Sequence, residues 1–313
     1  MLAPVACIGS GLIGRSWAIV FARAGHEVRL WDAKPEASEA ARAFCAEVLP
    51  ELEQLGLIDC TATHALARIH TASTLEEALD GAIHVQESTF ENLAIKREIF
   101  ARLDAVAAPE TVLASSSSAL LPSAISEGLK GRARVMVNHP INPSYLVPAA
   151  ELVPAPWTDK SLMNRTAEML RAAGMQPIVM TKEIDGFVMN RMQGALLHEA
   201  FRLVAGGYAS AEDVDIGIRE GLALRWSFMG PFETIDLNAP GGVRDYVGRY
   251  AGVYENLAGQ PAADWQGKVL DQIEADRRVA LPQEKLSERQ AWRDRRLMAL
   301  ADHKRRAANE IGD

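Results

Sequence analysis

A glycine-rich turn near the start of the chain constrains its fold more than any other feature. Gly9-Ser-Gly11-Leu-Ile-Gly14 directly follows an apolar run at residues 5–8 and opens a helical pattern over residues 12–24. A second apolar run, at residues 28–31, ends at Asp32. A strand, three glycines at this spacing, a helix and an acidic residue after the next strand are typical of a dinucleotide-binding unit. An ordinary strand-turn-helix is the alternative.

Each residue of this turn has a physical reason to be there. Gly9 permits the tight turn, Gly11 lets the backbone approach a pyrophosphate, and Gly14 lets the helix pack closely on the sheet. The helix begins at Leu12 and Ile13, and its free N–H groups would face the phosphates. The sequence therefore predicts a phosphate-binding turn formed by these five residues.

Asp32 indicates which dinucleotide the chain binds. A carboxylate at this position accepts hydrogen bonds from the adenosine ribose hydroxyls and repels the 2′-phosphate of NADP. Ala33-Lys34-Pro35 follow, without an arginine that could bind such a phosphate. We expect NAD as the cofactor.

The first half of the chain alternates short apolar runs with helical patterns, as a parallel sheet with crossover helices does. Ser73 and Asp159 stand where helix N-caps belong. The further strands expected are residues 68–71, 82–86, 111–114, 134–137, 151–153 and 177–180. The further helices expected are residues 36–55, 74–79, 92–106 and 160–173.

The pattern changes after Lys182, where strand signals stop and helical spacing continues over residues 187–204. Ser210-Ala-Glu-Asp213 is a capping box, and the helix it opens is expected to end near Gly221. The sequence predicts an α/β, Rossmann-like doubly wound domain over residues 1–182 that binds NAD. An all-helical domain for substrate binding and dimerisation follows over residues 183–313.

Composition excludes several functions. With 33 basic and 41 acidic residues, the chain carries a net charge of −8, which disfavours nucleic-acid binding. The one dense basic stretch, residues 293–306, is interleaved with acidic residues and reads as a solvated helix face, and no apolar run reaches the roughly 20 residues that span a bilayer. Residues 1–7 run straight into the glycine turn and are read as a strand, not as a leader. Three scattered cysteines indicate a reduced, cytoplasmic protein and offer no metal-ligand spacing.

A histidine follows the strand expected at residues 134–137, in Asn138-His139-Pro140-Ile141-Asn142-Pro143. The carboxyl edge of a doubly wound sheet is where ligands bind. Glu151 opens the next strand, and neighbouring strands can bring the two side chains within hydrogen-bond reach. A carboxylate on one imidazole nitrogen fixes the tautomer and leaves the other nitrogen free as a base. A structural histidine in a rigid turn is the alternative.

Ser115-Ser-Ser-Ser118 ends another strand at the same edge. Ser118 is a candidate hydroxyl ligand for cofactor or substrate, although serine clusters are more often turn residues. A Ser/His/Glu hydrolase triad competes with this interpretation, but no G-x-S-x-G surrounds these serines.

Six motifs, taken in their order and spacing, resemble the 3-hydroxyacyl-CoA dehydrogenase superfamily over nearly the whole chain. They are the glycine turn, Glu87-Ser-Thr-Phe-Glu91-Asn-Leu, the serine run, His139-Pro-Ile-Asn142-Pro, Gly186-Phe-Val-Met-Asn190-Arg and Gly230-Pro-Phe-Glu. Residues 221–242 look most like the lambda-crystallin branch, which includes L-gulonate 3-dehydrogenase and has carnitine 3-dehydrogenase as a near relative. Ser116 stands where the long-chain relatives carry asparagine.

The resemblance implies a role for each matching residue. His139 would be the general base and Glu151 its partner, while Ser118 and Asn190 would hydrogen-bond the reacting oxygen of the substrate. Asn142 would lie close to the nicotinamide. Glu91 and Lys96 match positions that contact the cofactor in the family; without the resemblance both would pass as solvent-exposed helix charges.

The substrate class follows from charge. Residues 34–68 contain three basic and six acidic residues, where acyl-CoA relatives carry a lysine-rich helical pair, so the balance opposes CoA binding. A small 3-hydroxy acid needs one cation for its carboxylate, and Arg225 is our candidate, with a structural role at a helix end as the alternative. Three alternative functions stay open. They are an acyl-CoA enzyme, a carnitine-type dehydrogenase with Trp226 and Tyr246 around the ammonium group, and a crystallin-like structural NAD-binding protein. The amphipathic helix of the second domain predicts a homodimer, as in the family.

Overall fold

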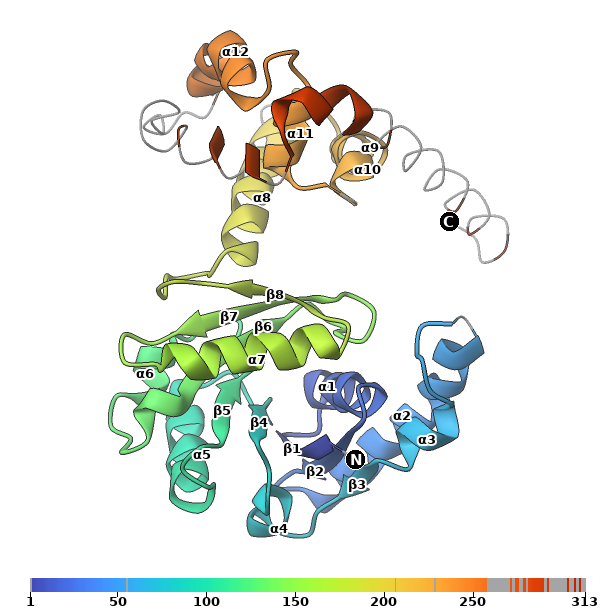
Figure 1. Cartoon of the computed structure of the whole chain (residues 1–313), viewed down its shortest axis with the longest axis vertical. Helices are drawn as coiled ribbons and strands as arrows, with labels where there is room; N and C mark the ends of the chain where they lie inside the picture. Colours follow the sequence, from blue (N-terminus) through green and yellow to red (C-terminus); the bar gives the residue numbers. More distant parts are fainter. Residues whose placement is uncertain are drawn as a thin grey trace. The chain divides into compact units, whose positions relative to one another are not determined.

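The computed structural model describes residues 2–54, 56–205, 207–227, 229–257, 271, 274–275, 278–279, 281–289, 292, 303, 307 and 310. The chain divides into two compact units, Met1–Ala195 and Leu196–Asp313, and each is described by itself (Figure 1). The division falls within helix α8, Met189–Ala205. A functional boundary at residue 182 stays a prediction.

The first unit is built on one eight-stranded sheet in the order β3-β2-β1-β4-β5-β6-β7-β8 (Figure 1). Strands β1 to β6 are parallel; β7 runs antiparallel to β6, and β8 is parallel to β7. The strand order reverses between β1 and β4, the position at which doubly wound sheets hold their ligands. The strands are β1 Leu2–Ile8, β2 His26–Trp31, β3 Ile69–Thr71, β4 His84–Glu87, β5 Val112–Ser115, β6 Val135–Pro140, β7 Ala149–Pro154 and β8 Gln176–Val179. The predicted doubly wound fold is confirmed.

Helices cover both faces of this sheet. One core contains residues of α1, α2 and α7, and the other contains residues of α4, α5 and α6. The helices are α1 Leu12–Arg23, α2 Pro35–Gln54, α3 Ala62–Leu66, α4 Leu75–Leu79, α5 Leu93–Val106, α6 Pro122–Ser126 and α7 Lys160–Ala172, with a 3₁₀ turn at Arg132–Arg134. The short helices α3 and α6 were not predicted, because five residues show little of a 3.6-residue period; α4 is equally short but was predicted at residues 74–79.

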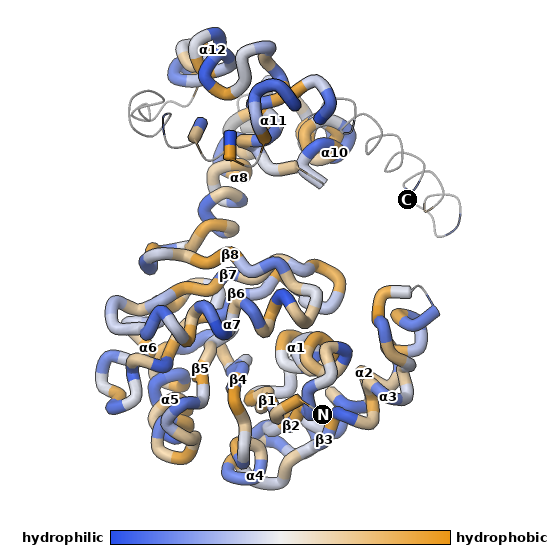
Figure 2. Tube along the Cα trace, viewed as in Figure 1, coloured by the Kyte–Doolittle hydropathy of each residue, from blue (hydrophilic) through white to orange (hydrophobic). Residues whose placement is uncertain are grey.

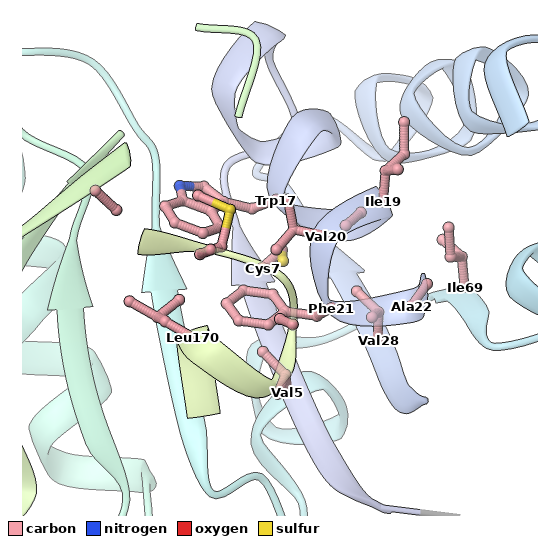
Figure 3. Packing of buried hydrophobic residues seen from close by; sticks show 14 of the residues in the cluster. Val5, Cys7, Trp17, Ile19, Val20, Phe21, Ala22, Val28, Ile69 and Leu170 are labelled. Carbon is pink, nitrogen blue, oxygen red and sulfur yellow. The ribbon is translucent and has the colours of Figure 1, made fainter. Parts of the chain in front are cut away.

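The two cores follow from side-chain alternation along β1. Val5 and Cys7 point into one core, and Ala6 and Ile8 point into the other, since successive residues of a strand face opposite sides. Trp17 of α1 packs in the first core and stacks on Phe21 one turn later, with ring centroids 5.4 Å apart (Figure 3). This packing fixes α1, and therefore the glycine turn before it, against the sheet.

Hydropathy follows the same layout: hydrophobic segments run along β1 and β2, and α7 carries many hydrophilic residues (Figure 2). Within the described parts of the chain, no helix combines the length and the apolar character needed to cross a membrane.

Helix caps show one correction at α4. The prediction of Ser73 as its N-cap is wrong, because the hydroxyl of Thr74 accepts the N–H of Glu77. The Glu77 carboxylate in turn accepts the N–H of Ser73, 2.7 Å away, so the cap is shifted by one residue. Asp159 caps α7 as predicted.

The second unit is helical where the structure describes it. After α8 come α9 Ala211–Ile216, a π-helical turn Gly217–Leu222, α10 Ala223–Trp226, α11 Pro231–Leu237 and α12 Val243–Leu257, with a later 3₁₀ turn Gln283–Lys285. The capping box of Ser210 and Asp213 is confirmed. The predicted end near Gly221 is wrong: Gly221 lacks the positive φ of a helix-terminating glycine, and the helical chain continues to Trp226. Most of the predicted basic stretch at residues 293–306 lies outside the described residues.

Candidate active site

The glycine turn connects β1 to α1 at the point where the strand order reverses. Gly9 has φ +91°, and a Cβ built there would lie 2.7 Å from the carbonyl carbon of Ser88. A Cβ on Gly14 would lie 1.8 Å from the carbonyl oxygen of Gly9. A Cβ on Gly11, by contrast, would meet no atom within 4 Å, which leaves open space beside the N-terminus of α1. The turn thus has two glycines that the fold requires and one that keeps space open.

Asp32 lies just after β2, beside this turn. Its two carboxylate oxygens accept the N–H groups of Ser10, at 2.8 Å, and Lys34, at 3.0 Å. A cavity of about 340 Å³ lies between the turn and α5. Its lining includes Gly9, Gly11, Asp32, Trp31, Ser88, Phe90 and Arg102. This cavity has a carboxylate, apolar walls and open backbone, which suits an adenosine diphosphate group.

His139 and Glu151 lie directly opposite each other on the antiparallel pair β6 and β7. The His139 Nδ1 atom is 2.6 Å from Oε2 of Glu151. His139 is 5% exposed and Glu151 is fully buried. Because Glu151 can only accept while ionised, the contact assigns a proton to Nδ1, and in the neutral ring Nε2 then keeps a lone pair.

The other oxygen of Glu151 accepts two backbone N–H groups at the start of α8, from Val188 at 2.6 Å and Met189 at 2.8 Å. Burial alone would raise the pKa of Glu151, but the hydrogen bonds from His139, Met189 and Val188 lower it below its usual value. Phe187, just before these N–H groups, has φ +52° and its ring lies 5.6 Å from that of His139. The sequence showed the motif Gly186-Phe, but it did not reveal that the backbone N–H groups after this motif bind Glu151.

Ser118 is exposed and follows β5 at the same edge. The side-chain amide of Asn190 donates to the carbonyl oxygen of Ser118 over 2.7 Å, so the structure brings these two residues together. Glu91 accepts the N–H groups of Ser118 and Ala119 and the hydroxyl of Ser117. The pKa of Glu91 is lowered, because these bonds and Lys96 outweigh the effect of burial. Glu91 therefore shapes the turn that carries Ser118.

Lys96 is buried rather than solvent-exposed, at 1% exposure. Its ammonium group donates to both oxygens of Glu87, at 3.0 and 3.1 Å, and lies 3.5 Å from Glu91. Glu87 is also fully buried and accepts the hydroxyl of Ser115 over 2.6 Å. Glu87 was assigned no role from the sequence, although it opens the motif that contains Glu91 and stands at the end of β4.

The remaining candidates lie apart from these contacts or in the second unit. Leu12 is exposed at the first position of α1, and Ile13 packs against the first core. Asn142 is exposed in the loop after β6. Arg225 lies on α10, and among the described residues its guanidinium has no hydrogen bond or ion pair. The described residues also contain no group of three or more metal-ligating side chains.

The residues present fit NAD. The open space at Gly11 admits a pyrophosphate against the N-terminus of α1, and the Asp32 carboxylate faces the cavity where a ribose would lie.

Comparison with known proteins places these features in one family. Residues 4–184 match the 3-hydroxyacyl-CoA dehydrogenase NAD binding domain, and residues 186–278 match the C-terminal domain of the same family. A lambda-crystallin homolog from Bos taurus is 42% identical over 306 residues, covering 96% of this chain and 95% of that protein. An L-carnitine dehydrogenase from Streptomyces griseus is 41% identical over 233 residues, covering 74% of this chain and 69% of that protein.

A solved structure extends the similarity to three dimensions. The 3-hydroxyacyl-CoA dehydrogenase from Archaeoglobus fulgidus has a TM-score of 0.73 at 26% identity, with 96% of this chain and 99% of that chain covered.

Proposed function

The chain belongs to the 3-hydroxyacyl-CoA dehydrogenase family, and we propose that it oxidises the 3-hydroxyl group of a small, L-gulonate-type 3-hydroxy acid to the 3-keto acid. Membership makes it an NAD-dependent oxidoreductase that acts on a CH–OH group. The proposal adds the substrate and the residues that carry the chemistry.

The contact between His139 and Glu151 carries the proposal. With its proton held on Nδ1 by Glu151, 2.6 Å away, the imidazole accepts the substrate hydroxyl proton at Nε2. The ionised carboxylate of Glu151 stabilises the positive charge that then forms on the ring. Bound NAD supplies the acceptor for the hydride from carbon 3.

Ser118 and Asn190 hold the substrate oxygen in this proposal. The amide of Asn190 uses one N–H on the Ser118 carbonyl and keeps its second N–H for another acceptor. The exposed hydroxyl of Ser118 lies on a turn fixed by Glu91. Donors held in place before the reaction are the most effective way to stabilise changing charge on an oxygen.

The cations near α2 support a small acid over a CoA ester. The Arg42 guanidinium donates to the Ile69 carbonyl over 2.9 Å, and that of Arg68 donates to the Ala22 carbonyl over 3.0 Å. Both guanidinium groups are thus hydrogen-bonded to backbone carbonyls of the protein. Lys34 is the third basic residue of residues 34–68, a segment with six acidic residues. Arg225 forms no hydrogen bond or ion pair with the described residues, although its charge acts on Tyr246, and it stays our candidate for the substrate carboxylate.

Carnitine is the second candidate substrate. The L-carnitine dehydrogenase match has nearly the same identity as the lambda-crystallin homolog match, 41% against 42%, but it extends over 233 rather than 306 residues. Tyr246 and Tyr250 on α12 have ring centroids 4.8 Å apart with their planes tilted by 48°, and groups of aromatic rings bind quaternary ammonium ions. Trp226 is 39% exposed in the same unit.

A substrate panel tests the proposal. NAD reduction is measured with L-gulonate, carnitine, 3-hydroxybutyrate and 3-hydroxybutyryl-CoA, with His139→Ala as the matched control. We expect turnover with the free hydroxy acid and a loss of about 10²–10⁴-fold in the control. Turnover with the CoA ester alone would reject the small-acid substrate. Equal rates in wild type and His139→Ala would reject His139 as the base, and inactivity throughout would favour a crystallin-like structural role.

The homodimer and the cytoplasmic location stay predictions. The dimer prediction is supported by the exposed apolar side chains of α8, among which Met192 is 59% and Phe201 is 74% exposed.

A further inference from the structure

A buried network of hydrogen bonds lies beneath the nucleotide cavity and centres on Ser116. The Ser116 Oγ atom lies 3.1 Å from the indole Nε1 of Trp17, 2.7 Å from Nε2 of Gln86 and 2.9 Å from the hydroxyl oxygen of Ser88. Trp17 and Gln86 are fully buried, and Ser116 is 9% exposed. The neighbours of Ser116 are therefore protein groups whose donor and acceptor capacities can be counted.

The count assigns the direction of the bond between the two serines. A hydroxyl has one proton and two lone pairs, while an indole N–H and an amide N–H only donate. Trp17 and Gln86 fill both lone pairs of Ser116. The third contact must then be donated by Ser116 itself, to Ser88.

The assignment of donors and acceptors also requires that the side-chain amide of Gln86 is not flipped. Its Nε2 also donates to the carbonyl oxygen of Asn138 over 3.2 Å. Its Oε1 accepts the side-chain amide of Asn138, at 2.8 Å, and Nε2 of His84, at 3.2 Å. All four hydrogen-bonding positions of the amide are used, so a flipped amide would place donors against donors.

His84 keeps this arrangement constant over the ordinary pH range. It must donate from Nε2, because Gln86 Oε1 only accepts, and its Nδ1 is buried without a partner among the described residues. Burial lowers the pKa of His84 to about 4, so the ring stays neutral. The neutral ring keeps one tautomer, and each hydrogen bond of the network therefore keeps the same donor and acceptor.

The network ends at Ser88, whose hydroxyl proton is the last donor in it. Ser88 accepts from Ser116, and among the described residues no other group bonds its hydroxyl. Ser88 lines the cavity together with Gly9, Gly11 and Asp32, and its carbonyl group is what a Cβ on Gly9 would strike. The free donor therefore lies beside the backbone that admits a pyrophosphate.

We propose that Ser88 is a cofactor-binding residue, whose hydroxyl donates to an oxygen of the ribose–diphosphate part of NAD and is pointed there by the Trp17–Gln86–Ser116 network. This role depends on NAD binding but not on the identity of the hydroxy acid. A hydroxyl whose direction is set in advance binds an oxygen acceptor without having to give up another bond.

Ser88→Ala tests the proposal, with dissociation constants measured by titration calorimetry in the absence of substrate. We expect the Kd for NAD and for ADP-ribose to rise about tenfold, as the loss of one hydrogen bond to a charged or strongly polar acceptor predicts. The Kd for adenosine, which lacks the diphosphate and the second ribose, should change less than twofold.

Ser126→Ala is the matched control, because its buried hydroxyl bonds the Pro122 carbonyl and the Trp157 indole, outside the cavity. Its Kd for NAD should equal that of wild type. An unchanged Kd for NAD in Ser88→Ala would overturn the proposal. So would a tenfold loss shared by adenosine or by Ser126→Ala, because the cause would then be general distortion. None of these outcomes depends on which hydroxy acid is oxidised.

Discussion

The Glu151 carboxylate holds His139 with one oxygen, over 2.6 Å, and is itself held through its other oxygen by the N–H groups of Val188 and Met189. The two oxygens have different partners, and all three partners donate. These three hydrogen bonds fix the orientation of the carboxylate and also stabilise its negative charge. Its lowered pKa keeps it ionised wherever the imidazole is neutral.

Glu151→Gln should remove the base without removing the cofactor site. If the new amide keeps its oxygen on Val188 and Met189, its NH₂ faces His139, which must then accept at Nδ1 and carry its proton on Nε2. The opposite orientation places NH₂ against two backbone donors, at a cost of about 1–3 kcal/mol. We expect kcat to fall about 10²–10⁴-fold.

The measurement is steady-state turnover together with the Kd for NAD in the same variant. An unchanged Kd separates loss of the base from unfolding. A Glu151→Gln variant that keeps kcat within threefold of wild type would show that the imidazole does not depend on this carboxylate.

Two glycines of the same turn should respond oppositely to alanine. A Cβ on Gly14 would lie 1.8 Å from the Gly9 carbonyl oxygen, which is backbone and cannot move aside, so Gly14→Ala should unfold or strongly destabilise the first unit. A Cβ on Gly11 meets nothing within 4 Å, so Gly11→Ala should melt like wild type. It should still lose NAD affinity, about tenfold or more, because the methyl group occupies the space of the pyrophosphate.

Thermal melts and NAD titrations of the two variants check this contrast. A Gly11→Ala variant with wild-type affinity would mean that the phosphates do not pass over this turn.

Lys96→Met should test the buried ion pair. The change leaves the Glu87 carboxylate, which is fully buried, without the cation 3.0 Å away. Removing one partner of a buried pair costs about 3–5 kcal/mol in the free energy of unfolding. The exposed Lys160 offers a control, since Lys160→Met should change stability by less than about 0.5 kcal/mol. Urea denaturation that gives equal stabilities for Lys96→Met and wild type would contradict the structural role of the pair.

Much of the fold could be predicted, because it depends on local patterns. The apolar run before Gly9 and the carboxylate after β2 fixed the nucleotide-binding end of the sheet. His139 and Glu151 could be paired in advance because they stand at the facing ends of consecutive strands, and the register places them opposite each other.

The missed contacts join residues far apart in the chain. Ser116 bonds Trp17, 99 residues away, and Gln86, 30 residues away. The hydrophobic pattern of the sequence does not predict either bond, since nothing distinguishes a buried Gln in a short strand from the other strand residues. The alternative interpretation of Lys96, as a solvent-exposed helix charge, is wrong for a different reason: its partner Glu87 is only nine residues away but lies on a different element, and helical spacing does not reveal a cation turned inward.

His84 should make the stability of the first unit depend on pH between 6.5 and 5. Burial lowers its folded pKa from 6.5 to about 4, outweighing the bond to Gln86 that favours the charged form. In this window the unfolded chain binds a proton that the folded chain does not, so stability rises with pH and is lost as the pH falls. From pH 6.5 to 5 the loss due to this one group is about 1.5 kcal/mol. Glu91 and Glu151 contribute little here, because their folded pKa values are lowered from 4.5 and the window lies above the pKa of both states.

His84→Gln isolates this contribution, because Gln keeps a donor for Gln86 but does not titrate. The variant loses packing against Phe21, whose ring lies 5.6 Å away, so its stability at pH 7 is lower and only the slopes are compared. Urea denaturation at pH 6.5 and 5 should show wild type losing about 1.5 kcal/mol more than the variant. Equal losses would mean that His84 takes up its proton in the folded chain over the same pH range as in the unfolded chain. Its second nitrogen would then need an acceptor that the described residues do not provide, and the single direction of the network ending at Ser88 would lose its basis.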